Sequence, residues 1–350
     1  MKLLVTGSGG LIGSEVCEYF NQLKYEIIGI DNNSRESFFG IEGSVAWKID
    51  YLKNKFNKYK HYYIDIRNSE AIDDIFKIEK PDAVVHCAAQ PSHDKATDMI
   101  LEDFEINTKG TLNLLNATFK TNKSSPFIYM STNKVYGDSP NNLAIIEKEK
   151  RWEFDDFHFM KGINEQQSID QSKHSFFGAG KLAADIYVQE FGRYFNMKTC
   201  CLRGGCLTGP SHSGVKLHGY LSYLVKCGIM NEKYTILGYK GKQVRDNIHS
   251  LDISKFIDVF LSDPKEGKVY NIGGGYENSC SILETIDYLS STFKIKFNYS
   301  YLENNRIGDH ICYYSDLTSI RNDYPNWKIT VSLEEILDQL NFNWRKKTDS

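Results

Sequence analysis

Three glycines near the start of the chain are spaced for contact with a phosphate group. They occupy positions 7, 10 and 13, after a short apolar segment and at the beginning of an amphipathic one. In a strand–turn–helix, Gly7 allows a tight turn, Gly10 lets the backbone approach a pyrophosphate, and Gly13 allows the helix to pack closely on the strand. The helix N-terminus then faces the anion. The pattern predicts a dinucleotide-binding loop, to which Leu11 and Ile12 also contribute.

An acidic residue ends the next apolar segment. Asp31 follows residues 26–30, about 20 residues beyond the loop, where a carboxylate accepts hydrogen bonds from the ribose hydroxyls of a dinucleotide. The same charge repels a 2′-phosphate, so the sequence predicts NAD rather than NADP as the cofactor. Arg35 argues the other way, because a guanidinium binds phosphate. A glycine-rich turn without a ligand is the alternative interpretation of this region.

Two later segments each place an arginine among mixed residues. Arg245 lies within residues 242–246, and Arg306 lies within residues 304–309. A guanidinium binds phosphate oxygens through paired, charge-assisted hydrogen bonds, so both arginines are candidates for a diphosphate clamp. A surface pair with Asp246 or Asp309 explains the same arginines without a ligand, and taken alone the residues favour that explanation.

The histidines do not indicate a metal centre. Their spacing lacks the short intervals typical of metal ligands, and polar contacts or packing explain them better. We therefore predict no metal at these four positions: His212, His218, His249 and His310.

The elements that must carry these residues alternate along the first half of the chain. Helical periodicity appears at residues 11–23, 104–119 and 177–195. Apolar segments that predict strands occupy residues 2–6, 26–30, 62–66, 83–89, 127–132 and 199–203. The alternation predicts an α/β fold with a Rossmann-type, doubly wound parallel sheet. Residues 139–173 are polar and aperiodic, which predicts a long functional loop.

Composition and charge exclude several classes of protein. The chain has 350 residues and a formal net charge of -3, so nothing favours a nucleic-acid partner. No apolar run approaches the roughly 20 residues that span a bilayer. The apolar start is broken by residues 7–10, unlike a signal peptide. We expect a cytoplasmic protein without membrane contact.

These motifs together resemble the extended short-chain dehydrogenase/reductases, and the resemblance runs along almost the whole chain. It implies a cofactor-binding set that is completed by Asn32, Asp65, Ile66, Ala88, Ala89, Gln90, Asn107 and Lys181. Residues 131–138 resemble the strand that carries the catalytic Ser or Thr, here Thr132. Within the family, residues 31–35, 131–138, 174–175 and 241–246 are most like the CDP-paratose (CDP-tyvelose) 2-epimerases.

The resemblance implies NAD-dependent epimerisation of a nucleotide-diphosphate sugar by transient oxidation to a keto-sugar. It also makes the diphosphate clamp the favoured explanation of the two arginines. The implied substrate-binding residues are Thr132, Asn133, Lys134, His174, Arg245 and Arg306. Residues 1–205, with a later contribution near 243–272, become the NAD-binding domain. Residues 206–350 become mainly a smaller C-terminal lobe that binds the nucleotide sugar, and a homo-oligomer (dimer or tetramer) is expected.

One catalytic position departs from the family. The resemblance assigns catalysis to Thr132, residue 177 and Lys181, but the expected tyrosine is Phe177, and a phenyl ring cannot move a proton. Three interpretations follow: an engineered change, a natural enzyme with another base, or a sensor that binds NAD without turnover. The candidate bases are Lys181 acting through water, His174 and Tyr136. Gly180 also replaces the serine that is usual in the subfamily.

Other activities on the same fold begin with the same oxidation. A nucleotide-sugar dehydrogenase, dehydratase or decarboxylase would use the same cofactor and a similar substrate. Dehydratases of the family typically carry an Asp-Glu pair after the catalytic threonine. Here Asn133 and Lys134 follow Thr132, which argues against dehydration.

Overall fold

A sheet and its helices form the first of two units into which the chain divides. The computed structural model describes residues 1–211, 219–306 and 308–348. Unit 1 comprises residues 1–135, 176–203 and 253–270, and unit 2 comprises 136–175, 204–252 and 271–350. The assignment of NAD binding and sugar binding to separate domains stays a prediction.

The seven-stranded sheet has the order β12-β8-β5-β4-β1-β2-β3, and β1 pairs in parallel with both β2 and β4. The chain thus runs outward from β1 to β3 and then returns to β4 on the other side. Ligands of doubly wound sheets bind at this reversal, beyond the carboxyl ends of the strands. The predicted α/β fold is confirmed. The strands are β1 (Lys2–Thr6), β2 (Glu26–Ile30), β3 (Tyr59–Tyr62), β4 (Ala83–His86), β5 (Phe127–Thr132), β8 (Thr199–Gly204) and β12 (Lys268–Ile272).

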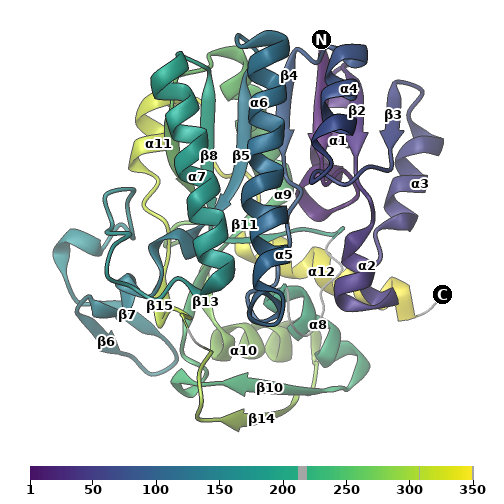
Figure 1. Ribbon diagram of the computed structural model, residues 1–350. Helices are drawn as coiled ribbons and strands as arrows, with labels where there is room; N and C mark the ends of the chain where they lie inside the picture. Colours follow the sequence, from purple (N-terminus) through teal and green to yellow (C-terminus); the bar gives the residue numbers. More distant parts are fainter. Residues whose placement is uncertain (212–218, 307, 349–350) are drawn as a thin grey trace. The chain divides into compact units, whose positions relative to one another are not determined.

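Three helices cover one face of the sheet, and Figure 1 shows two of them, α6 and α7, side by side. Their apolar stripes pack with strand residues such as Leu4, Val84 and Tyr129 into one core. The rings of Phe119 on α6 and Phe195 on α7 lie 4.5 Å apart. The three helices are α4 (Ser69–Glu79), α6 (Gly110–Asn122) and α7 (Ser175–Phe195).

The remaining unit 1 helices complete the connections between strands. Helices α1 and α9 are joined by a hydrogen bond of 3.1 Å from the hydroxyl of Tyr19 to Asp258. A short helix, α5, continues through a π-helical turn, η3 (Glu105–Lys109), into α6. The other helices are α1 (Leu11–Gln22), α2 (Ser34–Phe39), α3 (Ala46–Lys55), α5 (Ile100–Phe104) and α9 (Ser250–Ser262).

Two strand predictions were wrong in their limits. The third strand is Tyr59–Tyr62 rather than 62–66, because β3 pairs residue by residue with Ile27–Ile30 and ends level with that strand. The fourth ends at His86 rather than residue 89, so Ala88 and Ala89 lie in the loop beyond the sheet. Both corrections move predicted cofactor-binding residues out of strands and into loops at the carboxyl edge.

The sheets of unit 2 have fewer strands than the seven-stranded sheet of unit 1. Strand β11 (Val244–His249) pairs with β9 (Cys206–Thr208), β13 (Ser279–Ser281) and β15 (Cys312–Tyr313). The predicted loop at 139–173 contains an antiparallel hairpin, β6 (Ile145–Glu147) and β7 (Trp152–Phe154). The other elements are α8 (Tyr220–Met230), β10 (Lys233–Leu237), α10 (Ile282–Phe293), β14 (Asn298–Leu302), α11 (Thr318–Asp323) and α12 (Leu333–Thr348). Among the described residues, no helix is long and apolar enough to cross a membrane.

A buried ion pair fastens α7 to the sheet. Asp185 on α7 binds Arg203 on β8 through Oδ1 and Oδ2, at 2.9 and 3.1 Å. It also accepts hydrogen bonds of 2.6 Å from Ser131 on β5 and from Gln189. The bonds from Ser131 and Arg203 to this one carboxylate therefore define how α7 lies against β5 and β8.

We predict that Arg203→Met destabilises the protein by about 3–5 kcal/mol, because it leaves the Asp185 carboxylate buried without its cation. The measurement is urea unfolding followed by circular dichroism. Arg193→Met is the matched control, since Arg193 is on α7 with Asp185 but its side chain is 57% exposed. A loss for Arg203→Met as small as that for the control would contradict the prediction.

Candidate functional site

The glycine loop lies where the sheet order reverses, between β1 and β4. Gly7 has φ +66°, and a Cβ there would lie 2.8 Å from the backbone nitrogen of Ala88. A Cβ on Gly13 would lie 2.1 Å from the Gly7 carbonyl oxygen. Helix α1 begins without a side-chain cap, so its first amides, including those of Leu11 and Ile12, have no acceptor within the helix. The loop therefore fits the pyrophosphate of a dinucleotide.

Asp31 lies beside this loop. Its Oδ2 accepts a hydrogen bond of 2.9 Å from the amide of Gly9, and its Oδ1 accepts one of 2.8 Å from Asn33. Burial raises the pKa of Asp31, while these two amides and the charge of Arg35 lower it. The carboxylate thus supports the shape of the loop as well as offering lone pairs to a ribose.

Two further residues of the predicted cofactor-binding set, Asp65 and Ile66, lie on the loop after β3. Asn32 donates to Asp65 at 3.1 Å, and Asp65 also binds the guanidinium of Arg67 at 2.7 Å. Ile66 is buried and packs against Gly110, where a Cβ would meet it at 2.6 Å. The structure therefore brings Asn32 and Asp65 together.

A buried histidine joins the glycine loop to α6. His86 is fully buried, and burial holds its pKa well below the usual value, so the ring is neutral. Thr111 donates to the Asn107 carbonyl, hence it must accept from Nε2 of His86 at 2.9 Å. Nδ1 of His86 then accepts from Thr6, 2.7 Å away. Thr6 accepts in turn from the amide of Ala88 at 3.2 Å.

Asn107 lies in the π-helical turn and holds the loop after β4. Its side chain accepts from the amide of Gln90 and donates to the Gln90 carbonyl, both at 3.1 Å. Both amide side chains also donate to Asp103, each at 2.9 Å. Single π-helical turns inside α-helices are frequent at functional sites. Asn107 and Gln90, predicted together from the sequence, are thus in direct contact, while Ala89 is half-buried on the same loop.

The three predicted catalytic positions all belong to unit 1. Thr132 ends β5, and its hydroxyl accepts from the amide of Lys134 at 3.2 Å, which leaves its proton available. Phe177 is buried near the start of α7, one turn before Lys181. The ammonium of Lys181 donates to the carbonyl of Met130 at 2.7 Å and lies 4.2 Å from the centre of the Tyr129 ring. Burial lowers the pKa of Lys181 to about 8.

The predicted substrate residues divide between the units. Asn133, buried, and Lys134 follow Thr132 in unit 1. Arg245 in unit 2 is buried and binds Asp309 at 2.7 Å, the pairing that the sequence offered as the alternative to a clamp. Arg306 is half-buried in the loop after β14.

Two of the candidate replacement bases also lie in unit 2. His174 places Nε2 2.7 Å from the carbonyl of Ile169. Tyr136 donates its proton to Asn271 at 2.8 Å. The third candidate, Lys181, lies in unit 1 with Thr132 and Phe177.

Sequence reasoning missed two buried carboxylates around α7. Asp103 lies one helical turn before Asn107, and Asp185 lies one turn after Lys181. Both are essentially inaccessible to solvent. The spacing shows only that each carboxylate shares a helix face with a predicted site residue, because residues four apart are neighbours on a helix; it does not show that this face is buried.

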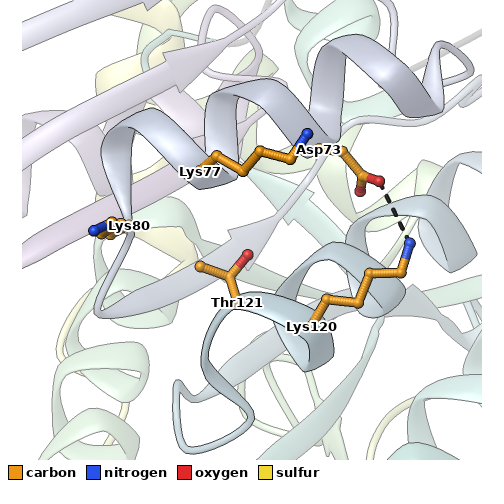
Figure 2. Close-up of a pocket in the computed structure, with 5 residues that line it drawn as sticks. All are labelled: Asp73, Lys77, Lys80, Lys120 and Thr121. Carbon is orange, nitrogen blue, oxygen red and sulfur yellow. Dashed lines mark hydrogen bonds and ion pairs between the residues drawn. The ribbon is translucent and has the colours of Figure 1, made fainter.

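A basic pocket of about 370 Å³ lies elsewhere, between α4 and α6 (Figure 2). Within it Lys120 contacts Asp73 at 3.4 Å. Lys80 and Thr121 shortly precede β4 and β5, so the pocket is at the amino edge of the sheet, opposite the glycine loop. Its other lining residue is Lys77. Its position gives it no part in the dinucleotide site.

No cluster of three or more His, Cys, Asp or Glu side chains suited to a metal occurs in the part of the chain that the structure describes. His249 contacts Gln339 at 3.0 Å and His310 contacts the Gly137 carbonyl at 2.7 Å. The other two histidines considered from the sequence, His212 and His218, lie outside the described residues.

Comparison with known proteins places this architecture in a family. The family model described as "NAD dependent epimerase/dehydratase family" matches residues 3–273. The CDP-paratose 2-epimerase of Salmonella typhi is 31% identical over 352 residues, covering 98% of this chain and 99% of that protein. A dTDP-glucose 4,6-dehydratase of Escherichia coli is 25% identical over 320 residues, covering 85% and 81%.

One solved structure has the same fold as this chain over the full length of both proteins. The UDP-glucose 4-epimerase of Thermotoga maritima, solved with UDP-glucose, superposes with a TM-score of 0.80 at 25% identity and covers 100% of both chains.

The position of Asp31 predicts that NAD binds more tightly than NADP, by roughly tenfold or more, because repulsion between two charges near 4 Å costs about 1–4 kcal/mol. Isothermal titration calorimetry with each dinucleotide measures the ratio. Asp31→Asn should reduce the preference for NAD over NADP, because it removes the charge that repels the 2′-phosphate. Tighter binding of NADP to the unaltered protein would contradict the prediction.

The buried amine of Lys181 predicts a pH-dependent stability. Its folded-state pKa of about 8 lies below the unfolded value of about 10.4, so the unfolded state holds more protons and stability rises with pH between these values. The rise is about 3 kcal/mol. Urea unfolding from pH 7 to 10 should show it in the unaltered protein but not in Lys181→Met. The exposed Lys123→Met should behave like the parent, and an unchanged profile in Lys181→Met would refute the expectation.

Proposed function

This chain belongs to the NAD dependent epimerase/dehydratase family, and we propose that it is an NAD-dependent epimerase of a nucleotide-diphosphate sugar. The observation that carries the proposal is the similarity to a CDP-paratose 2-epimerase over nearly the full length of both chains. A CDP-activated deoxyhexose is accordingly the first substrate to test.

The residues that would hold NAD are those around the glycine loop. The first amides of α1 would bind the pyrophosphate, and Asp31 with Asn32 would bind the adenosine ribose. The loop held by Asn107 would contact the second half of the dinucleotide. The chemistry that bound NAD supplies is reversible hydride transfer.

The chain's own residues then handle the sugar hydroxyl. Thr132 keeps its hydroxyl proton free and donates it to the sugar oxygen. Lys181 would hold the nicotinamide ribose and supply positive charge there. Phe177 fills the volume of the missing tyrosine but neither accepts nor donates a proton. Return of the hydride to the opposite face of the keto-sugar would invert one carbon.

In unit 2, Arg245 is the proposed contact for the substrate diphosphate, supported by Arg306, with His174 beside the sugar. Because Arg245 is already paired with Asp309, the diphosphate has to compete with that carboxylate. This competition suits a site that releases its product readily, since the arginine keeps a partner when the substrate leaves.

A dehydratase is the second candidate, because a dTDP-glucose 4,6-dehydratase is also similar to this chain. Elimination needs an acid and a base next to the catalytic threonine. The residues there are a buried amide, Asn133, and a lysine, Lys134, which offer no carboxylate. Epimerisation requires neither group and is therefore preferred. Homo-oligomer formation and a cytoplasmic location stay predictions.

Incubation with NAD and a panel of CDP-, dTDP-, UDP- and GDP-sugars tests the proposal. Products are read by NMR in deuterated water, where epimerisation by hydride transfer leaves the sugar free of deuterium. We expect epimerisation of a CDP-sugar. Loss of water with deuterium incorporation would favour the dehydratase, and NAD binding without any product would favour a sensor.

We also predict that Arg245→Gln weakens nucleotide-sugar binding by about ten- to a hundredfold, because a charge-assisted hydrogen bond contributes roughly 1.5–3 kcal/mol. Calorimetric titration with CDP and CDP-sugars measures the change, and the affinity for NAD should not alter. Asp309→Asn is the matched variant, and it should bind more tightly because the competing carboxylate is gone. The assignment of Arg245 to the diphosphate clamp is wrong if both variants bind CDP with the affinity of the parent.

A further inference from the structure

A histidine on β3, at the edge of the large sheet, contacts the residue proposed to bind the ribose. Nε2 of His61 lies 3.1 Å from the backbone carbonyl oxygen of Asp31. That carbonyl lies beyond Ile30 and Tyr62, the last residue pair of the two strands. Because a carbonyl oxygen only accepts hydrogen bonds, Nε2 must carry a proton and donate it. The side chain of His61 therefore holds the Asp31 peptide just past the end of the strand ladder.

The proton on Nε2 sets the direction of a longer chain of hydrogen bonds. The ring of His61 is neutral at pH 7, because burial lowers its pKa to about 4. Nδ1 therefore accepts, and its donor is the hydroxyl of Tyr59, 2.8 Å away. Tyr59 has then used its only proton and must accept from the hydroxyl of Ser8 at 3.0 Å. The chain runs from Ser8 in the glycine loop to the peptide of Asp31.

These contacts close into a ring that joins the glycine loop, β2 and β3. Ser8 is followed in the loop by Gly9, whose amide donates to Oδ2 of Asp31 at 2.9 Å. Asp31 is thus held at two points, at its carboxylate by the loop and at its carbonyl by His61. Because the aspartate side chain is short, a shift of its peptide would carry the carboxylate with it.

A glycine on β2 makes room for the ring. Tyr59 and His61 lie two residues apart on β3, so their side chains project from the same face. Gly29 pairs with His61, and a Cβ on Gly29 would lie 2.3 Å from the hydroxyl of Tyr59 and 2.8 Å from that of Ser8. Ser8 is fully buried and Tyr59 is 9% exposed. The two hydroxyls therefore meet in the space that a side chain at position 29 would fill.

Resting on the proposed contact between Asp31 and the adenosine ribose, we propose that His61 is a positioning residue for NAD, with Tyr59 as its support. The imidazole sets the Asp31 peptide so that the carboxylate reaches the ribose hydroxyls and stays near the place that a 2′-phosphate would occupy. His61 acts through Asp31 and takes no part in hydride or proton transfer. The preference for NAD over NADP thus depends on β3 as well as on the acidic residue after β2.

A double-mutant cycle tests this route. His61→Leu removes the donor, and we expect it to weaken NAD binding by about three- to tenfold, the usual effect of one hydrogen bond between neutral groups. NADP binding should fall less, so the preference for NAD should decrease. In an Asp31→Ala background the same substitution should have no further effect, because no carboxylate is left to position. Calorimetric titration measures each affinity.

Rescue by a conservative variant separates positioning from packing. In His61→Gln the side-chain amide can donate to the Asp31 carbonyl and accept from Tyr59, so NAD affinity should return to that of the parent. Tyr59→Phe interrupts the chain one step further away and should weaken NAD binding by about two- to threefold. It carries the same cycle with Asp31→Ala if His61→Leu does not fold, which thermal unfolding checks. Tyr63→Phe is the matched control, because Tyr63 is 59% exposed, and it should bind NAD as the parent does.

Nitrogen NMR of the protein without cofactor provides an independent readout. The imidazole signals of His61 should show the Nε2–H tautomer at pH 7. The Nδ1 signal should shift in Tyr59→Phe, which removes its donor, and should not shift in Tyr63→Phe. A bare Nε2 in the parent would overturn the inference, because it could not hold the Asp31 carbonyl.

Two binding results would also overturn the role of His61. One is an NAD affinity in His61→Leu equal to that of the parent. The other is an equal loss of affinity with and without the Asp31 carboxylate, which would mean that His61 acts elsewhere. Both results leave the proposed function standing. If the parent does not bind NAD, or if Asp31→Ala binds it as tightly as the parent, the proposed cofactor contact is itself refuted and this inference falls with it.

Discussion

The attachment of α7 to β5 is the constraint on which the catalytic region depends. Two polar side chains one turn apart on α7 contact consecutive residues of β5: Lys181 binds the carbonyl of Met130, and Asp185 binds the hydroxyl of Ser131. The pair with Arg203 extends the contact to β8. Such buried ionic contacts add little net stability but tolerate few arrangements. They hold the helix carrying residues 177 and 181 against the strand that ends in Thr132.

Burial also decides the charges in this region. Lys181 loses hydration and its pKa falls, whereas the pKa of Asp103 rises for the same reason. His86 is neutral, so its two hydrogen bonds have a defined direction. The same low-polarity surroundings that strengthen each polar contact thus adjust which groups exchange protons near neutral pH. A change in the packing of α5, α6 or α7 would alter that chemistry without touching a substrate.

The loss of one hydroxyl at position 177 has consequences that differ for binding and for turnover. The phenyl ring occupies the space of a phenol, so neither the cofactor loop nor the threonine has to move. Proton transfer is the step that requires a new group. The family assignment and the question of catalytic power are therefore separate: the first rests on the whole chain, the second on a few atoms around α7.

The sequence by itself determined the α/β class, the glycine loop, the acidic residue after β2 and the family. These follow from local patterns, because periodicity and glycine spacing describe a strand–turn–helix without reference to distant residues. The limits of β3 and β4 needed the structure, since register with a neighbouring strand decides where pairing ends. The partner of Arg245 could be proposed from sequence, yet only the fold selects Asp309 over Asp246. Asp103 and Asp185 emerged from the tertiary structure alone, because whether an acidic residue on a helix faces solvent or a buried neighbour depends on how that helix packs.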